Sequence, residues 1–181
     1  MNRRYVLTGA PGCGKTTTLE ALGQRGHAVV AEAATDVIAA QQVLGVNAPW
    51  ELPGFVDRVV DLQRERRLIG PDAEVQFIDR SPLCSLALAR YLRLAVSQAT
   101  LHEVAAVVDG RLLERDVFLL RPLGFIEPTA ARQISYQDSL KFEAVHEAVY
   151  REYGFTLVDV APVDVESRVH AIESHVQTPR S

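Results

Sequence analysis

The amino-acid sequence predicts an α/β domain built on a largely parallel sheet. Short apolar segments alternate with longer segments whose apolar residues recur at helical spacing, which is the pattern of strands joined by helices. A glycine-rich stretch separates the first apolar segment from the first longer one, which favours a tight turn between a strand and a helix. The 181 residues suit one compact domain, and a hydrophobic content of 48% is sufficient for one core.

Strands are expected where short apolar runs are bounded by polar or turn-forming residues. The first run leads into Gly9, and the second follows Gly26 and ends near Glu32. The third run ends in Asp79, and the fifth comes directly after Gly154. The expected strands span residues 4–8, 27–31, 75–78, 117–120 and 155–160.

Helices are expected between these strands. The apolar residues from Phe55 to Val60 recur at helical spacing, and Ser135 with Asp138 resembles a helix cap. The two prolines and the single tryptophan of residues 47–53 indicate a loop. Five helices are expected at about residues 15–24, 33–44, 53–69, 83–96 and 101–113. A sixth is expected from the Ser135 cap to residue 153, and a last one after residue 164.

Composition narrows the class of protein. No repeat or linker divides the chain, so residues 1–176 are expected to form a single domain and residues 177–181 a tail. A net charge of −4 argues against binding nucleic acid through a basic face. Cys13 and Cys84 form no metal-binding or disulfide pattern. No stretch approaches the ~18 apolar residues that span a membrane, so we expect a cytoplasmic location; the sequence leaves a homodimer open.

The segment from Gly9 to Thr16 matches the phosphate-binding pattern G-x-x-x-x-G-K-[ST] at every position. A strand is expected before it and a helix after it, as the motif requires. The loop N–H groups and the helix N-terminus attract phosphate, the catalytic candidate Lys15 can reach the β- and γ-phosphates, and the Thr16 hydroxyl can bind Mg²⁺. No Asn-Lys-x-Asp motif is present, which favours adenine over guanine. ATP is expected to contact Gly9, Ala10, Pro11, Gly12, Cys13, Gly14, Lys15, Thr16 and Thr17.

Three charged residues follow the second and third strands, where strand ends face the ligand in an open α/β sheet. Asp79 is a candidate Mg²⁺ ligand, directly or through water, or else a solvated acid. Arg80 is expected to neutralise charge on the donor or acceptor, or to form a structural salt bridge. Glu32 is expected to accept a proton from a substrate hydroxyl, or to be an ordinary acid at a helix N-terminus.

Further residues are candidates for the acceptor side of the site. Gln63 is a polar residue on an apolar helix face. It is expected either to hydrogen-bond to a substrate or to lie at the boundary between the buried and exposed faces of the helix. Trp50 and Phe55 are expected either to stack on a flat substrate or to belong to the core. Arg132 is the preferred catalytic residue of a basic lid at about residues 122–141, which also contains Lys141; a solvated surface arginine is the alternative.

These segments together resemble a family of small, AAA-type P-loop ATPases, which is similar to the ribosylnicotinamide kinase domain and to deoxynucleoside and nucleoside monophosphate kinases. The matching segments are GAPGCGKTT, VVAEAATDVI, the Gln63 region, FIDRSP, and VFLLRPL leading to Arg132, and they cover the chain from residue 4 to about 160. The resemblance implies a P-loop NTPase fold with three α/β/α layers and a five-stranded parallel sheet of order 2-3-1-4-5. It also implies that Glu32 acts as base. Asp79 departs from the glutamate that is usual in those kinases.

The leading hypothesis is a Mg-ATP-dependent kinase for a small acceptor that carries a hydroxyl or a phosphate and resembles a nucleoside. One alternative is a regulatory ATPase that acts on a protein partner. Another is a phosphotransferase that confers resistance to a small molecule, which differs from the leading hypothesis only in the acceptor.

Overall fold

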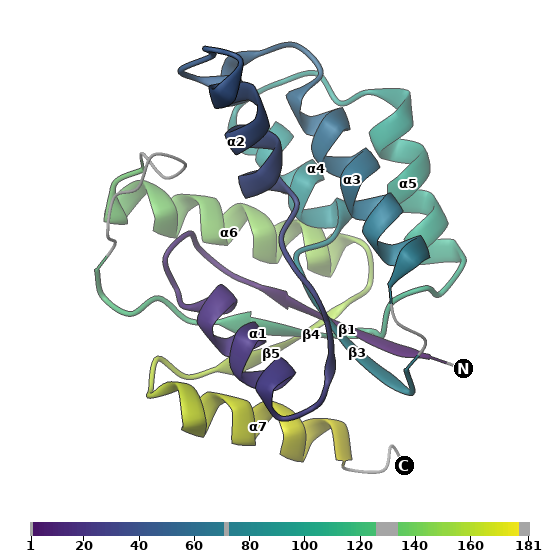
Figure 1. Cartoon of the computed structure of the whole chain (residues 1–181), viewed down its shortest axis with the longest axis vertical. Coiled ribbons are helices and arrows are strands. Elements are labelled where there is room, and N and C mark those ends of the chain that lie inside the picture. The colour runs from purple at the N-terminus through teal and green to yellow at the C-terminus, as the bar shows by residue number, and fades with distance from the viewer. Residues whose placement is uncertain (1, 71–72, 126–133, 178–181) are drawn as a thin grey trace.

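A five-stranded parallel sheet runs through the centre of the computed structural model, which describes residues 2–70, 73–125 and 134–177 (Figure 1). The strand order is β2-β3-β1-β4-β5, as expected from the resemblance. Every pair of neighbouring strands is parallel, and Leu7 of β1 lies in register with Asp79 of β3 and Phe118 of β4. The strands are β1 (Arg3–Thr8), β2 (Ala28–Val30), β3 (Val75–Asp79), β4 (Asp116–Leu120) and β5 (Thr156–Val160).

Helices cover both faces of the sheet and make the three layers that the sequence predicts (Figure 1). Helices α1 and α7 pack on one face, and α4, α5 and α6 pack on the other. Helices α2 and α3 extend this second layer beyond the sheet, where α3 packs beside α4 and α2 packs against α3. The described helices are α1 (Lys15–Gln24), α2 (Ala34–Val43), the 3-10 turn η1 (Pro49–Glu51), α3 (Phe55–Ile69), α4 (Pro82–Tyr91), α5 (Gln98–Asp109), α6 (Tyr136–Glu152) and α7 (Val165–Gln177).

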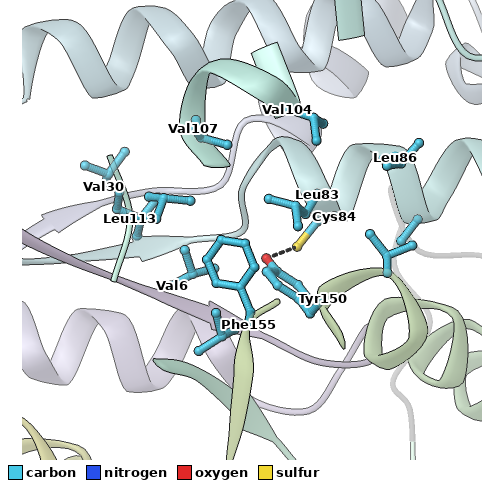
Figure 2. Close-up of a cluster of buried hydrophobic side chains, with 14 of the residues drawn as sticks. Val6, Val30, Leu83, Cys84, Leu86, Val104, Val107, Leu113, Tyr150 and Phe155 are labelled. Carbon is cyan, nitrogen blue, oxygen red and sulfur yellow. Dashed lines mark hydrogen bonds between the residues drawn. The ribbon is translucent and has the colours of Figure 1, made fainter. Parts of the chain in front are cut away.

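The alternation of side chains along β1 explains the two halves of the core. Tyr5 and Leu7 point to the layer of α1 and α7, whereas Val6 points to the opposite layer. Figure 2 shows the second half, in which the ring of Phe155 lies beside that of Tyr150 of α6, with Val6 nearby. Because both sheet faces are covered, the central strands are largely buried and mostly apolar, as expected for a parallel sheet, with Thr8, Gln76 and Asp79 as buried polar exceptions.

Three helix boundaries differ from the sequence prediction by three or more residues, and one of them is the end of α5, which lies at Asp109 rather than at residue 113. Helix α4 ends at Tyr91 rather than near residue 96, because the chain turns at Arg93, whose φ is +55°. Helix α5 begins at Gln98, three residues earlier than expected, because the Ser97 side chain accepts a hydrogen bond from the N–H of Thr100 at 3.0 Å. The Ser135 cap of α6 is confirmed by a matching 3.1 Å bond from the N–H of Asp138. Within the described residues, no helix is both long and apolar enough to cross a bilayer.

Gly9 occupies a position at the end of β1 that a side chain cannot share. Its φ is +135°, and an added Cβ would lie 2.5 Å from the backbone oxygen of Leu120. We expect Gly9→Ala to lower the free energy of unfolding by roughly 1–3 kcal/mol more than Gly26→Ala does. Gly26 is the matched control because its φ is also positive, +91°, but an added Cβ there has open space. Urea denaturation measures both values, and equal losses would contradict the steric explanation.

Candidate active site

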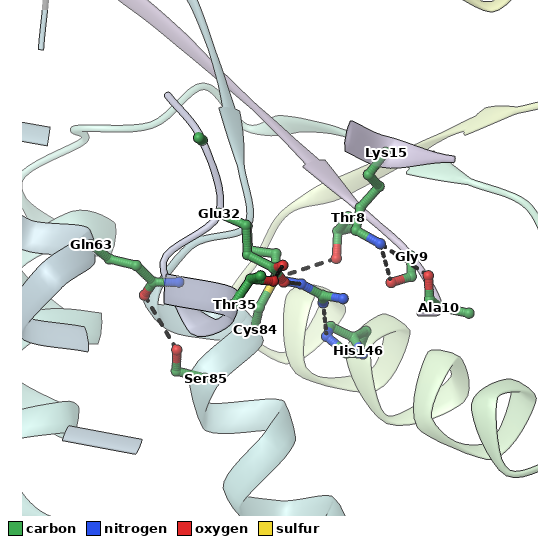
Figure 3. A network of polar contacts seen from close by, with 12 residues as sticks. Thr8, Gly9, Ala10, Lys15, Glu32, Thr35, Gln63, Cys84, Ser85 and His146 are labelled. Carbon is green, nitrogen blue, oxygen red and sulfur yellow. Dashed lines mark hydrogen bonds and ion pairs between the residues drawn. The ribbon is translucent and has the colours of Figure 1, made fainter. Parts of the chain in front are cut away.

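The glycine-rich loop lies between the carboxyl end of β1 and the first turn of α1. Gly9, Gly12 and Gly14 all have positive φ, so the loop follows a path that other residues rarely adopt. Lys15 begins α1 and is buried, and its Nζ donates to the backbone oxygens of Gly9 at 3.2 Å and Ala10 at 2.9 Å (Figure 3). The loop therefore folds around its own lysine, and the ammonium group lies within the loop.

Helix α6 supports the loop from one side. Glu143 accepts a hydrogen bond from the N–H of Ala10 at 3.3 Å, and it pairs with Arg121 at 3.0 Å. Arg121 also pairs with Glu147 at 2.6 Å and Asp159 at 2.8 Å. The positive charge of Arg121 is thus engaged by three carboxylates at the end of β4.

Glu32 and Arg80 form an ion pair at the carboxyl edge of the sheet, although 48 residues separate them in the chain (Figure 3). The Arg80 Nε donates to Glu32 Oε1 at 2.5 Å, and the Thr35 hydroxyl donates to Glu32 Oε2 at 2.7 Å. Burial alone would raise the pKa of Glu32, but the charges of Arg80 and Lys15 outweigh it and lower this pKa to about 2. Glu32 is therefore ionised at neutral pH.

His146 holds the other side of Arg80, a contact that the sequence did not reveal. Its Nε2 lies 3.2 Å from Arg80 Nη1, and its Nδ1 lies 2.9 Å from the backbone oxygen of Phe142 (Figure 3). Burial and the charge of Arg80 lower the pKa of His146 to about 3, so the ring is neutral. The neutral ring donates from Nδ1 to Phe142 and accepts at Nε2 from Arg80. The available sequence signal is its helical spacing with Phe142 and Val149, which places it on the buried face of α6.

Arg80 is also held through its backbone. Its φ is +69°, which is uncommon for a residue with a side chain, and its N–H donates to the backbone oxygen of Leu7 at 3.1 Å. The following residue, Ser81, caps α4 and lies 2.7 Å from the Tyr150 hydroxyl of α6. The guanidinium direction is therefore determined by contacts with β1, Glu32 and α6, and such over-determined backbone strain is typical of functional positions.

Asp79 is the last residue of β3 and is buried beside Lys15 and Arg80. Its Oδ1 has no hydrogen-bond partner among the described residues. Burial raises the pKa of Asp79 to about 6, although the charges of Lys15 and Arg80 act in the opposite direction. A buried carboxylate with an unused oxygen at this edge fits the expected role of holding a cation, directly or through water. Within the described residues, no group of three His, Cys, Asp or Glu could hold a metal without other ligands.

A cavity of about 1040 Å³ joins these groups at the carboxyl edge of the sheet. Most of the residues predicted for the site line it: Pro11, Gly12, Gly14, Lys15, Thr16, Thr17, Glu32, Trp50, Phe55, Gln63, Asp79 and Arg80. Gly9, Ala10 and Cys13, which are also loop residues, do not line the cavity, and the side chains of Ala10 and Cys13 are buried. The loop lines one part of the cavity, and α2, α3 and α4 line the part beyond Glu32.

The part of the cavity beyond Glu32 is largely apolar. Phe55 is both a core residue and a lining residue, so its two alternative interpretations are compatible. Gln63 of α3 also lines the cavity, and its Oε1 accepts a hydrogen bond from the hydroxyl of Ser85 in α4 at 3.2 Å (Figure 3). Tyr91 and Phe142, which the sequence did not single out, complete the apolar lining with ring centroids 4.8 Å apart.

The predicted lid is only partly described. Arg132 lies outside the described residues. Residues 136–141 belong to the first turns of α6 rather than to an irregular lid. Lys141 is exposed there and pairs with Asp138 at 2.8 Å. Leu123 and Phe125 line the cavity before the segment that contains Arg132 begins.

We expect Asp79→Asn to stabilise the ligand-free protein. The raised pKa means that the folded state favours the protonated carboxyl, so stability falls as pH rises from about 4 to about 6 and the full cost applies above that range. A shift from 3.8 to about 6 corresponds to roughly 3 kcal/mol at neutral pH. Urea denaturation of both proteins at pH 4 and pH 7 measures the gain, which should be large only at pH 7. A variant that is less stable than wild type at pH 7 would contradict the inference that burial of the Asp79 carboxylate destabilises the folded state.

Fold and site together define a P-loop nucleoside triphosphatase domain: a parallel sheet of order 2-3-1-4-5 with a glycine-rich loop, lysine and threonine after its central strand. The sequence profile of the AAA domain family matches residues 4–168 of this chain, and the chain belongs to this family. A comparison with curated protein sequences gives no significant match.

Solved structures of kinases share the fold. A deoxyadenosine kinase from M. mycoides with bound dATP superposes with a TM-score of 0.60 at 13% identity, covering 98% of this chain and 100% of that chain. The NadR protein in complex with NR gives a TM-score of 0.68 at 13% identity, covering 99% of this chain and 52% of that chain. This chain thus spans about half the length of NadR. The resemblance expected from the sequence is confirmed at the level of fold and family.

Proposed function

We propose that this protein is a Mg-ATP-dependent kinase that transfers the γ-phosphoryl group to a hydroxyl of a small, nucleoside-like acceptor. The observation that carries the proposal is the ionised Glu32, held by Arg80 beside the phosphate-binding loop, at the point where the cavity passes from the loop into an apolar chamber. A donor site alone would not need a carboxylate and an apolar extension of the cavity on its far side.

The donor half of the reaction belongs to the loop. Gly12 and Gly14 turn backbone N–H groups toward an anion, and Lys15 supplies the positive charge that meets the β- and γ-phosphates. Thr16 is exposed at the cavity wall, and Asp79 has an unused carboxylate oxygen. These two residues would hold Mg²⁺, which neutralises charge on the phosphate oxygens when it is bound.

Glu32 orients the acceptor hydroxyl. With a pKa of about 2 it is a weak base, but phosphoryl transfer goes through a loose transition state in which the hydroxyl proton leaves late. The carboxylate therefore accepts a hydrogen bond that aims the hydroxyl oxygen at phosphorus, and it receives the proton as the new O–P bond forms. Arg80, held by Glu32 and His146, places its positive charge beside the transferred group.

The lining of the chamber favours a neutral hydroxyl acceptor over a phosphate-bearing one. Lys15 and Arg80 are the only lysine or arginine among the described lining residues, and Arg80 is already paired with Glu32. The carboxylates of Asp36 and Asp138 also line the wall, and they pair with Arg66 and Lys141 respectively. Gln63 offers an amide, and Phe55 and Tyr91 offer ring faces, a combination that suits a flat heterocycle with polar edges.

The test is a panel assay with purified protein and Mg-ATP. Nucleosides are the first group, the corresponding 5′-monophosphates are the second, and amino sugars and other small alcohols are the third. We expect ADP production to rise at least tenfold above the rate without acceptor for a member of the first group, with a phosphorylated product seen by mass spectrometry. Slow hydrolysis that no acceptor accelerates would contradict the proposal and favour a regulatory ATPase. A product only from the third group would favour a resistance phosphotransferase.

A further inference from the structure

An arginine of the last helix contacts the back of the phosphate-binding loop. Arg168 lies in the first turns of α7 and is only 2% exposed. Its Nη1 donates to the backbone oxygen of Cys13 at 2.8 Å, across 155 residues of sequence. An added Cβ on Gly14 would lie 2.6 Å from the same Nη1. The guanidinium therefore packs directly against the peptide that joins Cys13 to Gly14.

The geometry of that peptide connects Arg168 to the cavity. In a trans peptide the C=O and the following N–H point in opposite directions. Gly14 lines the cavity, whereas Cys13 and Arg168 do not. Since Arg168 holds the Cys13 oxygen from behind, the N–H of Gly14 is directed to the cavity side of the loop, where a phosphate would bind.

The charge of Arg168 lacks a counter-ion in the described part of the chain. The Nε and Nη2 atoms are buried and have no hydrogen-bond partner among the described residues, and the Nη1 atom donates to the neutral backbone oxygen of Cys13. A buried cation without an anion is costly, and its field is weakly screened. An anion bound in the loop would lie on the cavity side of the Cys13–Gly14 peptide, opposite Arg168, and would compensate the charge of this arginine.

We propose that Arg168 is a positioning residue for phosphate binding: it orients and polarises the Cys13–Gly14 peptide, so that the N–H of Gly14 becomes a stronger donor to a phosphate. The role rests on the proposed function only in that the anion belongs to a nucleotide. Arg168 does not touch the nucleotide itself, which distinguishes it from Lys15. Gly14 is required at this place because its φ is +86° and because a side chain would displace the guanidinium.

The experiment compares Arg168→Met with Arg115→Met in the full chain. Arg115 is the matched control, because its Nη1 also donates to a backbone oxygen, that of Tyr153 at 3.0 Å, but at the amino end of β4 away from the loop. The dissociation constants for Mg-ATP and for inorganic tripolyphosphate are measured by calorimetry, and the ligand-free melting temperature is recorded for each variant.

We expect Arg168→Met to weaken binding of both ligands by roughly tenfold or more, and Arg168→Lys, which keeps the charge, to recover part of that loss. Arg115→Met should lower the melting temperature and leave both dissociation constants within about twofold of wild type. A folded Arg168→Met with wild-type affinity would overturn the inference. If wild type itself binds neither ligand, the proposed function fails; if wild type and Arg168 variants behave as expected but no acceptor is phosphorylated, only the kinase assignment fails.

A second measurement does not depend on the variant folding. The amide proton of Gly14 is followed by NMR in the wild-type protein while tripolyphosphate is added. We expect a large downfield shift, because a polarised N–H that donates to an anion is strongly deshielded. An unchanged Gly14 resonance in a protein that binds tripolyphosphate would overturn the inference.

Discussion

Replacing Lys15 with alanine is expected to abolish measurable Mg-ATP binding. The cationic group of Lys15 lies inside the loop, where it donates to the backbone oxygens of Gly9 and Ala10. The substitution removes the charge that meets the β- and γ-phosphates, and it also removes an internal support of the loop. We expect the dissociation constant to rise by at least a hundredfold, as measured by calorimetry or by displacement of a fluorescent ATP analogue.

Lys141 provides the matched control, because it is the only other lysine of the chain. It is exposed on α6 and pairs with Asp138 over one helical turn, a contact of small energetic value. Lys141→Ala should therefore leave ATP affinity within about twofold of wild type. An unchanged affinity in folded Lys15→Ala would refute the assignment of the loop as a nucleotide site, and with it the proposed function.

Replacing Glu32 with glutamine is expected to reduce phosphoryl transfer by roughly 10²–10⁴-fold with the best acceptor. Glutamine keeps the size of the side chain but cannot receive the hydroxyl proton, and it no longer compensates the charge of Arg80. The affinity for Mg-ATP should change much less, because Glu32 lies on the acceptor side of the loop. Steady-state kinetics gives the turnover number, and calorimetry gives the affinity for ATP.

The pH dependence of stability provides an independent readout for Glu32. Its pKa is lowered from 4.5 to about 2, so the ion pair with Arg80 stabilises the folded state above pH 4.5, and this contribution is lost as pH falls toward 2. The difference in unfolding free energy between wild type and Glu32→Gln should shrink over that range. Glu152→Gln removes an exposed ion pair with Arg90 and serves as control for both measurements. Turnover equal to wild type in Glu32→Gln would show that the carboxylate does not act on the acceptor.

The donor side of the site could be predicted from local sequence. The loop is a contiguous motif between a strand and a helix, and the spacing of its glycines, lysine and threonine specifies where each lies around a phosphate. Asp79 and Glu32 could be predicted because each ends an apolar run, and parallel strands present their carboxyl ends at one edge of a sheet. The roles of these residues stay predictions, but their convergence on one cavity agrees with them.

The acceptor side could be predicted only in part. Gln63 and Phe55 were found because a polar and an aromatic residue stand out on one helix face, and both line the cavity. Tyr91 and Phe142 were missed because each belongs to an ordinary amphipathic pattern, and nothing in such a pattern says which apolar residue borders a cavity. The end of α4 and the start of α5 differ from the prediction because a left-handed residue at Arg93 and a serine cap at Ser97 prevail over the apolar periodicity.

By itself, the sequence determined the parallel α/β fold, the phosphate-binding loop and the strand ends that carry Glu32 and Asp79, since each is encoded by neighbouring residues whose spacing specifies the local backbone. Only the tertiary structure decided that Glu32 pairs with Arg80, that a neutral His146 holds that arginine, and that Arg168 packs behind the loop. These contacts join residues that are 48, 66 and 155 positions apart. They depend on how helices pack against a twisted sheet, and periodicity specifies which face of a helix is buried without specifying its partner.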